Sequence, residues 1–345
     1  MKKICFLFAA AALLAACSGK KAAESAADAP APMKVIFETD MGNDVDDALA
    51  YDMLIKYAEQ GKIDLLGISS NKPDSSSVEY LDILNTWYGH EIPLGHVVNG
   101  AKCDDAVNYA LAVCDMNDAE GNPLFARSGA RAIPSVELYR RLLAEQPDSS
   151  VTVISVGFYT NLAQLLASQP DSVSPLSGRD LVAAKVARLV TMAGNMQNAD
   201  FYEYNVIRDV PAAQAVFAQW PTEIVTSPFE LGIDVLYPGA SIEKDFAWAT
   251  PAHPVAEAYK AYLPMPYDRP CWDLTSVLYA VEGTDGYFTV SEPGTIEVTD
   301  KGATIFTPDS LANRRYLMAD SAQRANIVAR FVELIPYVPE KYAQK

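Results

Sequence analysis

Four aspartates lie within eight residues near the start of the chain, at Asp40, Asp44, Asp46 and Asp47. Their carboxylates repel one another, so holding them together is unfavourable unless a cation binds between them. A hard cation fits this set, because Ca²⁺ accepts several carboxylates together with main-chain carbonyls and water. The alternative is that these aspartates only cap a helix N-terminus, where acidic side chains are favoured.

The residues around this aspartate segment predict a strand followed by a helix. Residues 35–37 are apolar and partly β-branched, as in a buried strand, and residues 48–58 have helical spacing with Leu49, Met53 and Leu54 on one side. The carboxylates are therefore expected at the carboxyl end of a strand and in the first turn of a helix. Ligands bind at this end of the strands in open α/β sheets.

Strand and helix patterns alternate along most of the chain, as they do in parallel sheets. They predict a strand at 64–69, a helix from Ser76, a helix within 133–150, a strand, turn and helix within 151–170, and a strand at 188–192. Residues 101–132 look irregular, and residues 287–308 alternate like antiparallel strands. We therefore predict one α/β domain, residues 34–345, with an open, mainly parallel central sheet flanked by helices.

The N-terminus has the pattern of an export signal. Two lysines precede an apolar run that is too short to span a membrane, and small residues then lead to Cys17. This resembles the bacterial lipobox, after which cleavage leaves a lipidated Cys17. We expect a signal peptide at 1–16, a tether at 17–33 and a membrane-anchored lipoprotein, with Ser18 favouring the outer membrane. Ordinary signal cleavage next to a chance cysteine is the alternative.

The composition narrows the class of partner. The chain carries a formal net charge of −17, and half of its residues are apolar. Such an acidic surface argues against nucleic acid and anionic lipid, whose phosphates attract Lys and Arg. We expect a small neutral molecule as the ligand and contact with a membrane only through the N-terminal lipid. The sequence is compatible with a monomer and with a homo-oligomer.

Residues 40–50, DMGNDVDDALA, resemble the N-terminal aspartate signature of the inosine-uridine preferring nucleoside hydrolase family, usually written DTDPGxDDAxA. Four later segments resemble other family motifs in family order: SVGFYTNLA from residue 155, MAGN from 192, EYN from 203 and WDLTSVLYA from 272. The resemblance spans about 35–281. The chain departs from it by two extra residues in the first motif, by Glu38 in place of Asp and by Met41 in place of Pro.

This resemblance implies an open α/β fold with a Rossmann-like core, one tightly bound Ca²⁺ and hydrolysis of ribonucleosides to base and ribose. The implied Ca²⁺ ligands are Asp40, Asp47, the main-chain carbonyl of Val156, and Asp273. Asp40 would also be the catalytic base that activates a Ca²⁺-bound water. The residues implied to bind the substrate are Asp46, Asn71, Asn198, Glu203 and Asn205. Carboxylates suit this reaction because C–N cleavage builds positive charge on the ribose.

Trp272 is the clearest departure from the family. Many members have a His immediately before the last acidic ligand, and that His can protonate the departing base. An indole does not donate a useful proton at neutral pH. We therefore expect Trp272 to bind the substrate by stacking on the base, which favours purine ribonucleosides. The alternative is that Trp272 only packs against the protein.

The same residues leave one alternative function and argue against two others. A lipoprotein that binds a nucleoside or sugar without cleaving it would keep the metal site, and it is the main alternative. A haloacid-dehalogenase-like phosphatase needs an Asp at the first position after the strand, where this chain has Glu38. An EF-hand is excluded because Tyr51 occupies the position of its bidentate Glu.

Overall fold

The computed structural model describes residues 31–102 and 107–343. Within the chain, residues 32–345 form one compact unit. The predicted signal peptide, Cys17 and most of the predicted tether lie outside the described residues. Among the helices of the described ranges, none combines the length and the apolar character that crossing a membrane requires.

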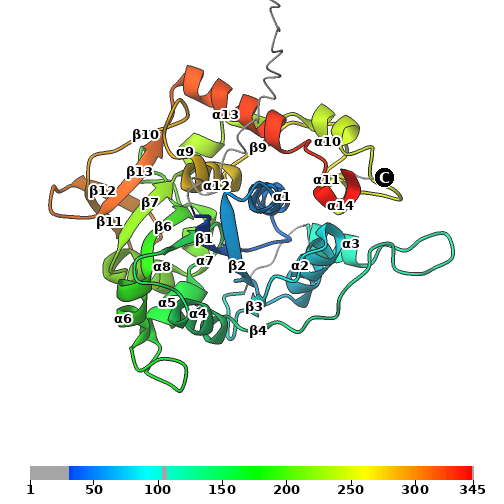
Figure 1. Cartoon of the computed structure of the whole chain (residues 1–345). Helices are drawn as coiled ribbons and strands as arrows, with labels where there is room; N and C mark the ends of the chain where they lie inside the picture. Colours follow the sequence, from blue (N-terminus) through cyan, green and yellow to red (C-terminus); the bar gives the residue numbers. More distant parts are fainter. Residues whose placement is uncertain (1–30, 103–106, 344–345) are drawn as a thin grey trace, which may run out of the picture. The chain divides into compact units, whose positions relative to one another are not determined.

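One large sheet forms the centre of the fold (Figure 1). Its strands are β1 (Met33–Thr39), β2 (Ile63–Ser70), β3 (Leu94–His96), β4 (Ile133–Pro134), β5 (Val151–Ser155), β6 (Val186–Met192), β7 (Glu223–Ser227), β10 (Thr289–Val290), β11 (Gly294–Val298), β12 (Thr304–Pro308) and β13 (Arg314–Met318). The strand order is β12-β11-β13-β7-β6-β5-β1-β2-β3-β4, with β10 also paired to β13. Neighbours from β13 to β4 run parallel. This confirms the predicted open, mainly parallel sheet.

Helices cover both faces of the sheet, and each face has its own apolar cluster. The helices are α1 (Asp46–Glu59), α2 (Ser75–Tyr88), α3 (Tyr109–Cys114), α4 (Ser135–Ala144), α5 (Thr160–Ala167), α6 (Gly178–Lys185), α7 (Tyr204–Arg208), α8 (Val210–Gln219), α9 (Phe229–Gly232), α10 (Gly239–Asp245), α11 (Pro254–Tyr262), α12 (Asp273–Glu282), α13 (Ser321–Leu334) and α14 (Glu340–Ala343). A short ribbon pairs β8 (Leu236–Tyr237) with β9 (Arg269–Pro270). One cluster lies under α1, α2, α11 and α12, and the other lies under α4, α5, α6 and α8.

The central strand β1 delivers the chain to the aspartate segment. Its side chains alternate between the two faces, so Val35 and Phe37 join the cluster under α1 and α12, whereas Ile36 joins the cluster under α4 and α5. β1 lies between β2 and β5, and all three strands run parallel. Burial on both faces explains why residues 35–37 form a continuous apolar run.

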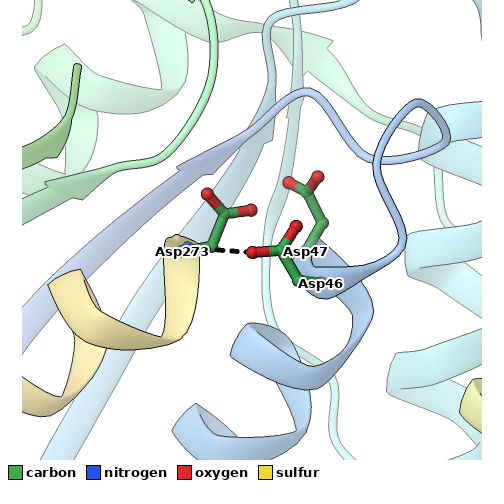
Figure 2. Close-up of side chains that lie close together, drawn as sticks. All are labelled: Asp46, Asp47 and Asp273. Carbon is green, nitrogen blue, oxygen red and sulfur yellow. Dashed lines mark hydrogen bonds between the residues drawn. The ribbon is translucent and has the colours of Figure 1, made fainter. Parts of the chain in front are cut away.

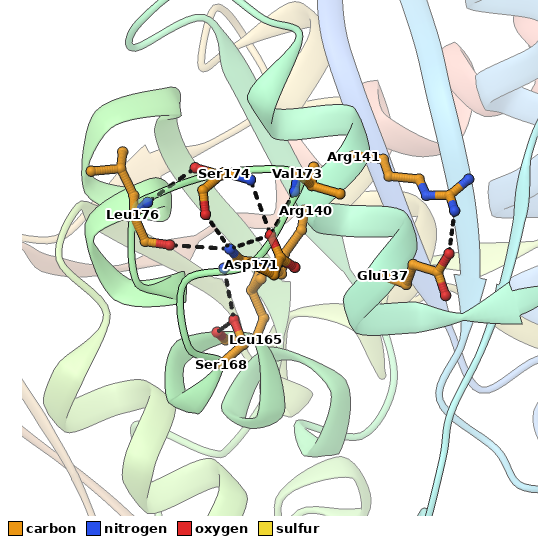
Figure 3. Close-up of polar contacts among 9 residues, drawn as sticks. All are labelled: Glu137, Arg140, Arg141, Leu165, Ser168, Asp171, Val173, Ser174 and Leu176. Atoms are coloured by element: carbon orange, nitrogen blue, oxygen red, sulfur yellow. Dashed lines mark hydrogen bonds and ion pairs between the residues drawn. The ribbon is translucent and has the colours of Figure 1, made fainter.

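The connection between α5 and α6 is anchored by a buried arginine on α4 (Figure 3). Arg140 is only 2% exposed. Its Nε donates to Asp171 Oδ2 at 2.7 Å, and one terminal nitrogen donates to Asp171 Oδ1 at 2.9 Å. The same nitrogen also donates to the carbonyls of Ser174 and Leu176. These bonds satisfy a buried cation and hold the loop against α4.

Some features differ from the sequence-based expectations. α3 lies within residues 101–132, which were expected to be irregular, and it is too short for its apolar spacing to be recognised. β11 and β12, within residues 287–308, pair antiparallel as expected, whereas β13 joins β7 in parallel. α6 was not predicted either. None of these elements carries a predicted site residue.

Candidate active site

The aspartate segment links the end of β1 to the start of α1. Thr39, the last residue of β1, donates its hydroxyl to a carboxylate oxygen of Asp47 and accepts a hydrogen bond from the main-chain N–H of Met41 at 3.0 Å. Gly42 has φ +114, a conformation that L side chains rarely adopt, and a Cβ there would lie 3.1 Å from Ala110 Cβ. Glycine thus allows the sharp turn that places Asp40 and Asp47 together.

A second connection joins this segment to the start of α12. Asp46 Oδ2 accepts hydrogen bonds from the main-chain N–H groups of Trp272, at 2.9 Å, and of Asp273, at 3.0 Å. Figure 2 shows Asp46 and Asp47 on the first turn of α1, facing Asp273 on α12. Each of the three residues offers a carboxylate oxygen, and these three oxygens lie within 4.8 Å of one another. The fold therefore gathers three buried carboxylates from two ends of the sequence.

The three carboxylates make each other's ionisation unfavourable. The pKa values of Asp46, Asp47 and Asp273 lie well above the usual range, and burial is the main cause. Repulsion adds to it, chiefly from Asp44 on Asp46, from Asp40 on Asp47 and from Asp46 on Asp273. Asp47 Oδ2 is buried and has no hydrogen-bond partner among the described residues. A set of crowded oxygen donors with an orphaned carboxylate oxygen fits a hard cation.

These carboxylates face a pocket of about 250 Å³ at the carboxyl ends of the parallel strands. Its lining contains eight of the predicted site residues: Asp40, Asp46, Asp47, Val156, Glu203, Asn205, Trp272 and Asp273. It also contains five residues without a predicted role: Asn43, Asp44, Met192, Tyr204 and Phe229. Four of them lie inside segments that the sequence singled out: Asn43 and Asp44 in the aspartate segment, Met192 in MAGN and Tyr204 in EYN. Phe229 lies just after the end of β7.

Glu203 and Asn205 come from the turn that opens α7. Both Glu203 oxygens accept main-chain N–H groups, Oε1 from Asn205 at 2.8 Å and Oε2 from Gly194 at 3.1 Å and Val206 at 3.2 Å. Burial raises the pKa of Glu203 to about 7, and these hydrogen bonds oppose the rise. The Asn205 amide donates to the main-chain carbonyl of Val156 at 3.1 Å. The loops after β5 and β6 are thereby held together at the pocket.

Asn71 lies behind the pocket lining. Its main-chain N–H donates to Thr39 O at 3.0 Å, and its side chain is buried. A Cβ at Gly157 would lie 2.6 Å from the Asp40 nitrogen and 2.7 Å from the Asn71 amide, so only glycine fits there. The Glu38 carboxyl is buried beside Asn71, and burial raises its pKa to about 8. Glu38 and Asn71 therefore form a polar layer behind Asp40.

Trp272 and Phe229 form an aromatic wall in the pocket lining. Their ring centroids are 5.5 Å apart in a stacked arrangement, and Trp272 Nε1 donates to Phe229 O at 3.0 Å. Arg269 lies beside this wall, with its guanidinium carbon 5.3 Å from the Trp272 ring centroid. Arg269 also forms an ion pair with Asp44, whose role the sequence left undefined. The inserted residues of the first motif are thus tied to the segment before α12.

Asn198 occupies a different place from the other predicted residues. Its main-chain N–H donates to Asn195 Oδ1 at 2.8 Å, its side chain is exposed, and it does not line the pocket. Of the predicted residues within the described ranges, Asn71 and Asn198 are the two that the pocket lining does not include.

A family model described as inosine-uridine preferring nucleoside hydrolase matches residues 35–332. The chain belongs to this family. The match extends from β1 into α13, so it contains every residue of the pocket.

Individual members of the nucleoside hydrolase family give more distant matches. The pyrimidine-specific ribonucleoside hydrolase RihA of Citrobacter koseri is 28% identical over 199 residues, which cover 54% of this chain and 56% of that protein. The chain thus spans about half the length of the curated relatives it matches. Among solved structures, a purine-preferring ribonucleoside hydrolase from Gardnerella vaginalis has a TM-score of 0.66 at 17% identity, covering 88% of this chain and 98% of that one.

A plant nucleoside hydrolase, PpNRh1, has a TM-score of 0.65 at 18% identity, covering 89% of this chain and 100% of that one. At such identities these two structures establish the shared α/β fold.

Proposed function

We propose that this protein hydrolyses the N-glycosidic bond of ribonucleosides, releasing the base and ribose. The observation that carries the proposal is that one pocket is lined both by buried carboxylates and by an aromatic wall. The carboxylates suit a ribose and its developing positive charge, and Phe229 and Trp272 suit the base. Membership of the nucleoside hydrolase family supports the same activity.

The donor set supports Ca²⁺ as the bound cation. Asp40, Asp47, Asp273 and the carbonyl of Val156 would hold it, since all four residues line the pocket. When bound, Ca²⁺ would offset the repulsion between the carboxylates and make a water molecule easier to deprotonate. Asp46 is assigned to the ribose instead, because its Oδ2 is already held by two N–H groups of α12.

The protein's own groups then divide the work of hydrolysis. Asp40 accepts a proton from the attacking water, Asp46 and Asn205 hold ribose hydroxyls, and the Glu203 carboxylate adds a further acceptor. As the C–N bond stretches, the ribose becomes positively charged, and the surrounding carboxylates stabilise that charge. Among neutral substrates, the aromatic wall favours purines, which offer more surface for stacking than pyrimidines do.

We also propose that the protein is exported and held at the outer membrane by lipid on Cys17. The lipobox-like sequence before Cys17 supports this, and one catalytic domain would follow the tether. Metabolic labelling with a palmitate analogue tests the idea. Label on the wild type but not on Cys17→Ala is expected, and release of Cys17→Ala from the membrane fraction should accompany it. Equal labelling of both proteins would exclude the lipid.

The activity is tested by measuring ribose as reducing sugar from inosine, guanosine, adenosine, uridine, cytidine and 2′-deoxyinosine. Wild type, Asp40→Asn and Trp272→Ala are compared, and the metal content of each is determined. We expect turnover of ribonucleosides that is lost in Asp40→Asn and weakened for purines in Trp272→Ala. A metal-loaded wild type that binds a nucleoside but releases no ribose would instead identify a nucleoside-binding lipoprotein.

A further inference from the structure

An ion pair joins the aspartate segment to the short strand that precedes α12. The Asp44 carboxylate accepts two hydrogen bonds from the Arg269 guanidinium, one from Nε to Oδ1 at 2.9 Å and one from a terminal nitrogen to Oδ2. The Arg269 side chain is 18% exposed and that of Asp44 is 26% exposed. A two-point bond between planar groups fixes the orientation of the guanidinium as well as its distance from the carboxylate.

The Asp44 end of this ion pair is anchored to the start of α1. Asp44 Oδ1 also accepts the main-chain N–H of Val45 at 2.7 Å, immediately before α1 begins at Asp46. Asp46 in turn accepts the main-chain N–H of Trp272 at 2.9 Å. Asp44 lines the pocket, but it is neither a proposed cation ligand nor a proposed ribose contact. Its contacts therefore point to a role that it performs through Arg269.

The Arg269 end of the ion pair lies against two aromatic rings. The guanidinium carbon is 4.9 Å from the Tyr262 ring centroid and 5.3 Å from the Trp272 ring centroid. At such distances a cation is attracted to the face of an aromatic ring. Arg269 belongs to β9, which pairs with β8, and the N–H of Cys271 donates to Val235 O at 2.8 Å. The main chain on both sides of Arg269 is thus held in place.

The Trp272 indole has its other contacts with α9. Its Nε1 donates to Phe229 O at 3.0 Å, and the two rings stack with their centroids 5.5 Å apart. A Cβ at Gly232 would lie 2.3 Å from Trp272 Cδ1, so the indole packs directly against the main chain of α9. Removal of the Arg269 guanidinium would leave these contacts with α9 and take away the cation next to the ring.

We propose that Asp44 and Arg269 are positioning residues, which hold the Trp272 indole in the orientation that stacks on the base of the substrate. The proposal rests on the proposed hydrolase function, in which Trp272 contacts the base. A ring that is already held in place loses little conformational freedom when the base binds, whereas a mobile ring must be ordered at a cost in affinity. The ion pair therefore raises the affinity for the base and leaves the affinity for ribose unchanged.

Calorimetric titration of the full chain in saturating Ca²⁺ measures the two halves of the substrate separately, with hypoxanthine as the base and ribose as the sugar. We expect Arg269→Met to raise the Kd for hypoxanthine by about threefold to tenfold and to keep the Kd for ribose within about twofold of the wild-type value. Asp44→Asn should change both values in the same way. Equal losses for the two ligands, or wild-type hypoxanthine affinity in Arg269→Met, would overturn the proposal, as would a wild type that does not bind hypoxanthine.

A double-mutant cycle shows whether Arg269 acts through Trp272. Trp272→Ala should raise the Kd for hypoxanthine by about tenfold or more, because the stacking of a base on an aromatic ring is lost. Arg269→Met added to Trp272→Ala should then change the Kd by less than about twofold, because no indole remains to be positioned. A second loss as large as that in Arg269→Met alone would mean that the two residues act independently, which contradicts the proposal.

Two further variants separate position from charge and from general loosening of the segment before α12. Arg269→Lys keeps the positive charge but not the planar guanidinium, so it should also weaken hypoxanthine binding by about threefold or more. Full affinity in Arg269→Lys would show that the charge is sufficient, and positioning would be refuted. Lys260→Met is the matched control, because it removes an ion pair with Glu257 on α11 that lies outside the pocket lining. It should bind hypoxanthine like the wild type, and a loss equal to that in Arg269→Met would count against the proposal.

Ribose release from inosine decides the proposed function separately. A wild type that binds hypoxanthine with the expected dependence on Arg269 but releases no ribose would retain the positioning role and lose the hydrolase function. Where turnover is present, Arg269→Met should raise KM for inosine and leave kcat nearly unchanged, which is the pattern of an interaction made equally in the ground state and the transition state. A fall in kcat at unchanged KM would place Arg269 in the chemical step and overturn the proposal.

Discussion

Asp46 accepts a hydrogen bond from the main-chain N–H of Asp273 at 3.0 Å, although 227 positions separate the two residues. This bond fixes the first turn of α1 to the first turn of α12. It also brings the carboxylate of Asp273 beside that of Asp47, so the cation site depends on a contact between distant parts of the chain. Loss of one carboxylate at this junction should therefore affect metal binding more than loss of a carboxylate elsewhere in the pocket.

Asp47→Asn should remove most of the affinity for Ca²⁺. The substitution takes away one charge and replaces an orphaned carboxylate oxygen in the cluster. Because changes to outer-shell residues alone cost 10-fold to 100-fold in metal affinity, we expect a loss of more than about 100-fold, measured by calorimetric titration. Asp44→Asn is the matched control, since Asp44 pairs with Arg269. Equal losses in both variants would rule out this assignment of the cation site.

The sequence predicted the parts of this site that depend on local pattern. The alternation of β1, β2, β5 and β6 with helices placed the Asp40 segment and Glu203 at the same edge of the sheet. Asp44 is different, because its partner Arg269 lies 225 positions away and no local pattern reveals it. The sequence also did not predict that Asn198 is exposed, because its position depends on how the loop after β6 turns away from the pocket.

Gly157→Ala should impair catalysis with little change in the global fold. A Cβ would lie 2.6 Å from the Asp40 nitrogen, a main-chain atom that cannot move without displacing the aspartate segment. Misplacement of a catalytic group by about 1 Å can cost 100-fold, so we expect kcat to fall by about that factor. Gly121→Ala is a control for backbone strain without a clash, because Gly121 has φ +85 but a Cβ there meets nothing within 4 Å; it should lower stability and leave kcat unchanged. A wild-type value of kcat in Gly157→Ala would show that the protein accommodates the added Cβ without displacing Asp40.

Asn205 and Asn198 provide a direct comparison of two predicted substrate ligands. Asn205 is buried, lines the pocket and holds Val156 O, whereas Asn198 is exposed and lies outside the lining. Asn205→Ala should lower kcat/KM for ribonucleosides. The loss should correspond to about 1–3 kcal/mol of activation free energy, the cost of an unsatisfied buried partner. Asn198→Ala should leave kcat/KM close to the wild-type value. A large loss in Asn198→Ala would mean that the loop after β6 closes over the substrate.

Glu38→Gln should change how stability depends on pH. Burial raises the pKa of Glu38 to about 8, so the folded protein retains a proton that the unfolded chain releases near the usual pKa of 4.5. Between these values the folded state binds more protons, and the contribution of Glu38 to the free energy of unfolding falls by about 1.4 kcal/mol per pH unit as pH rises. Gln mimics the protonated carboxyl and removes this loss.

Urea unfolding of the Ca²⁺-saturated wild type and Glu38→Gln at several values from about pH 5 to pH 8 measures the difference. We expect the variant to gain stability relative to the wild type as pH rises through this range, since only the wild type must either hold a proton or bury a charge. Glu38→Asp serves as a second comparison, because it keeps an ionisable group in the same layer beside Asn71. Parallel pH profiles for wild type and Glu38→Gln would show that Glu38 is already ionised in the folded protein, and its neighbours Ser155 and Asn161 would then be donors to a buried carboxylate.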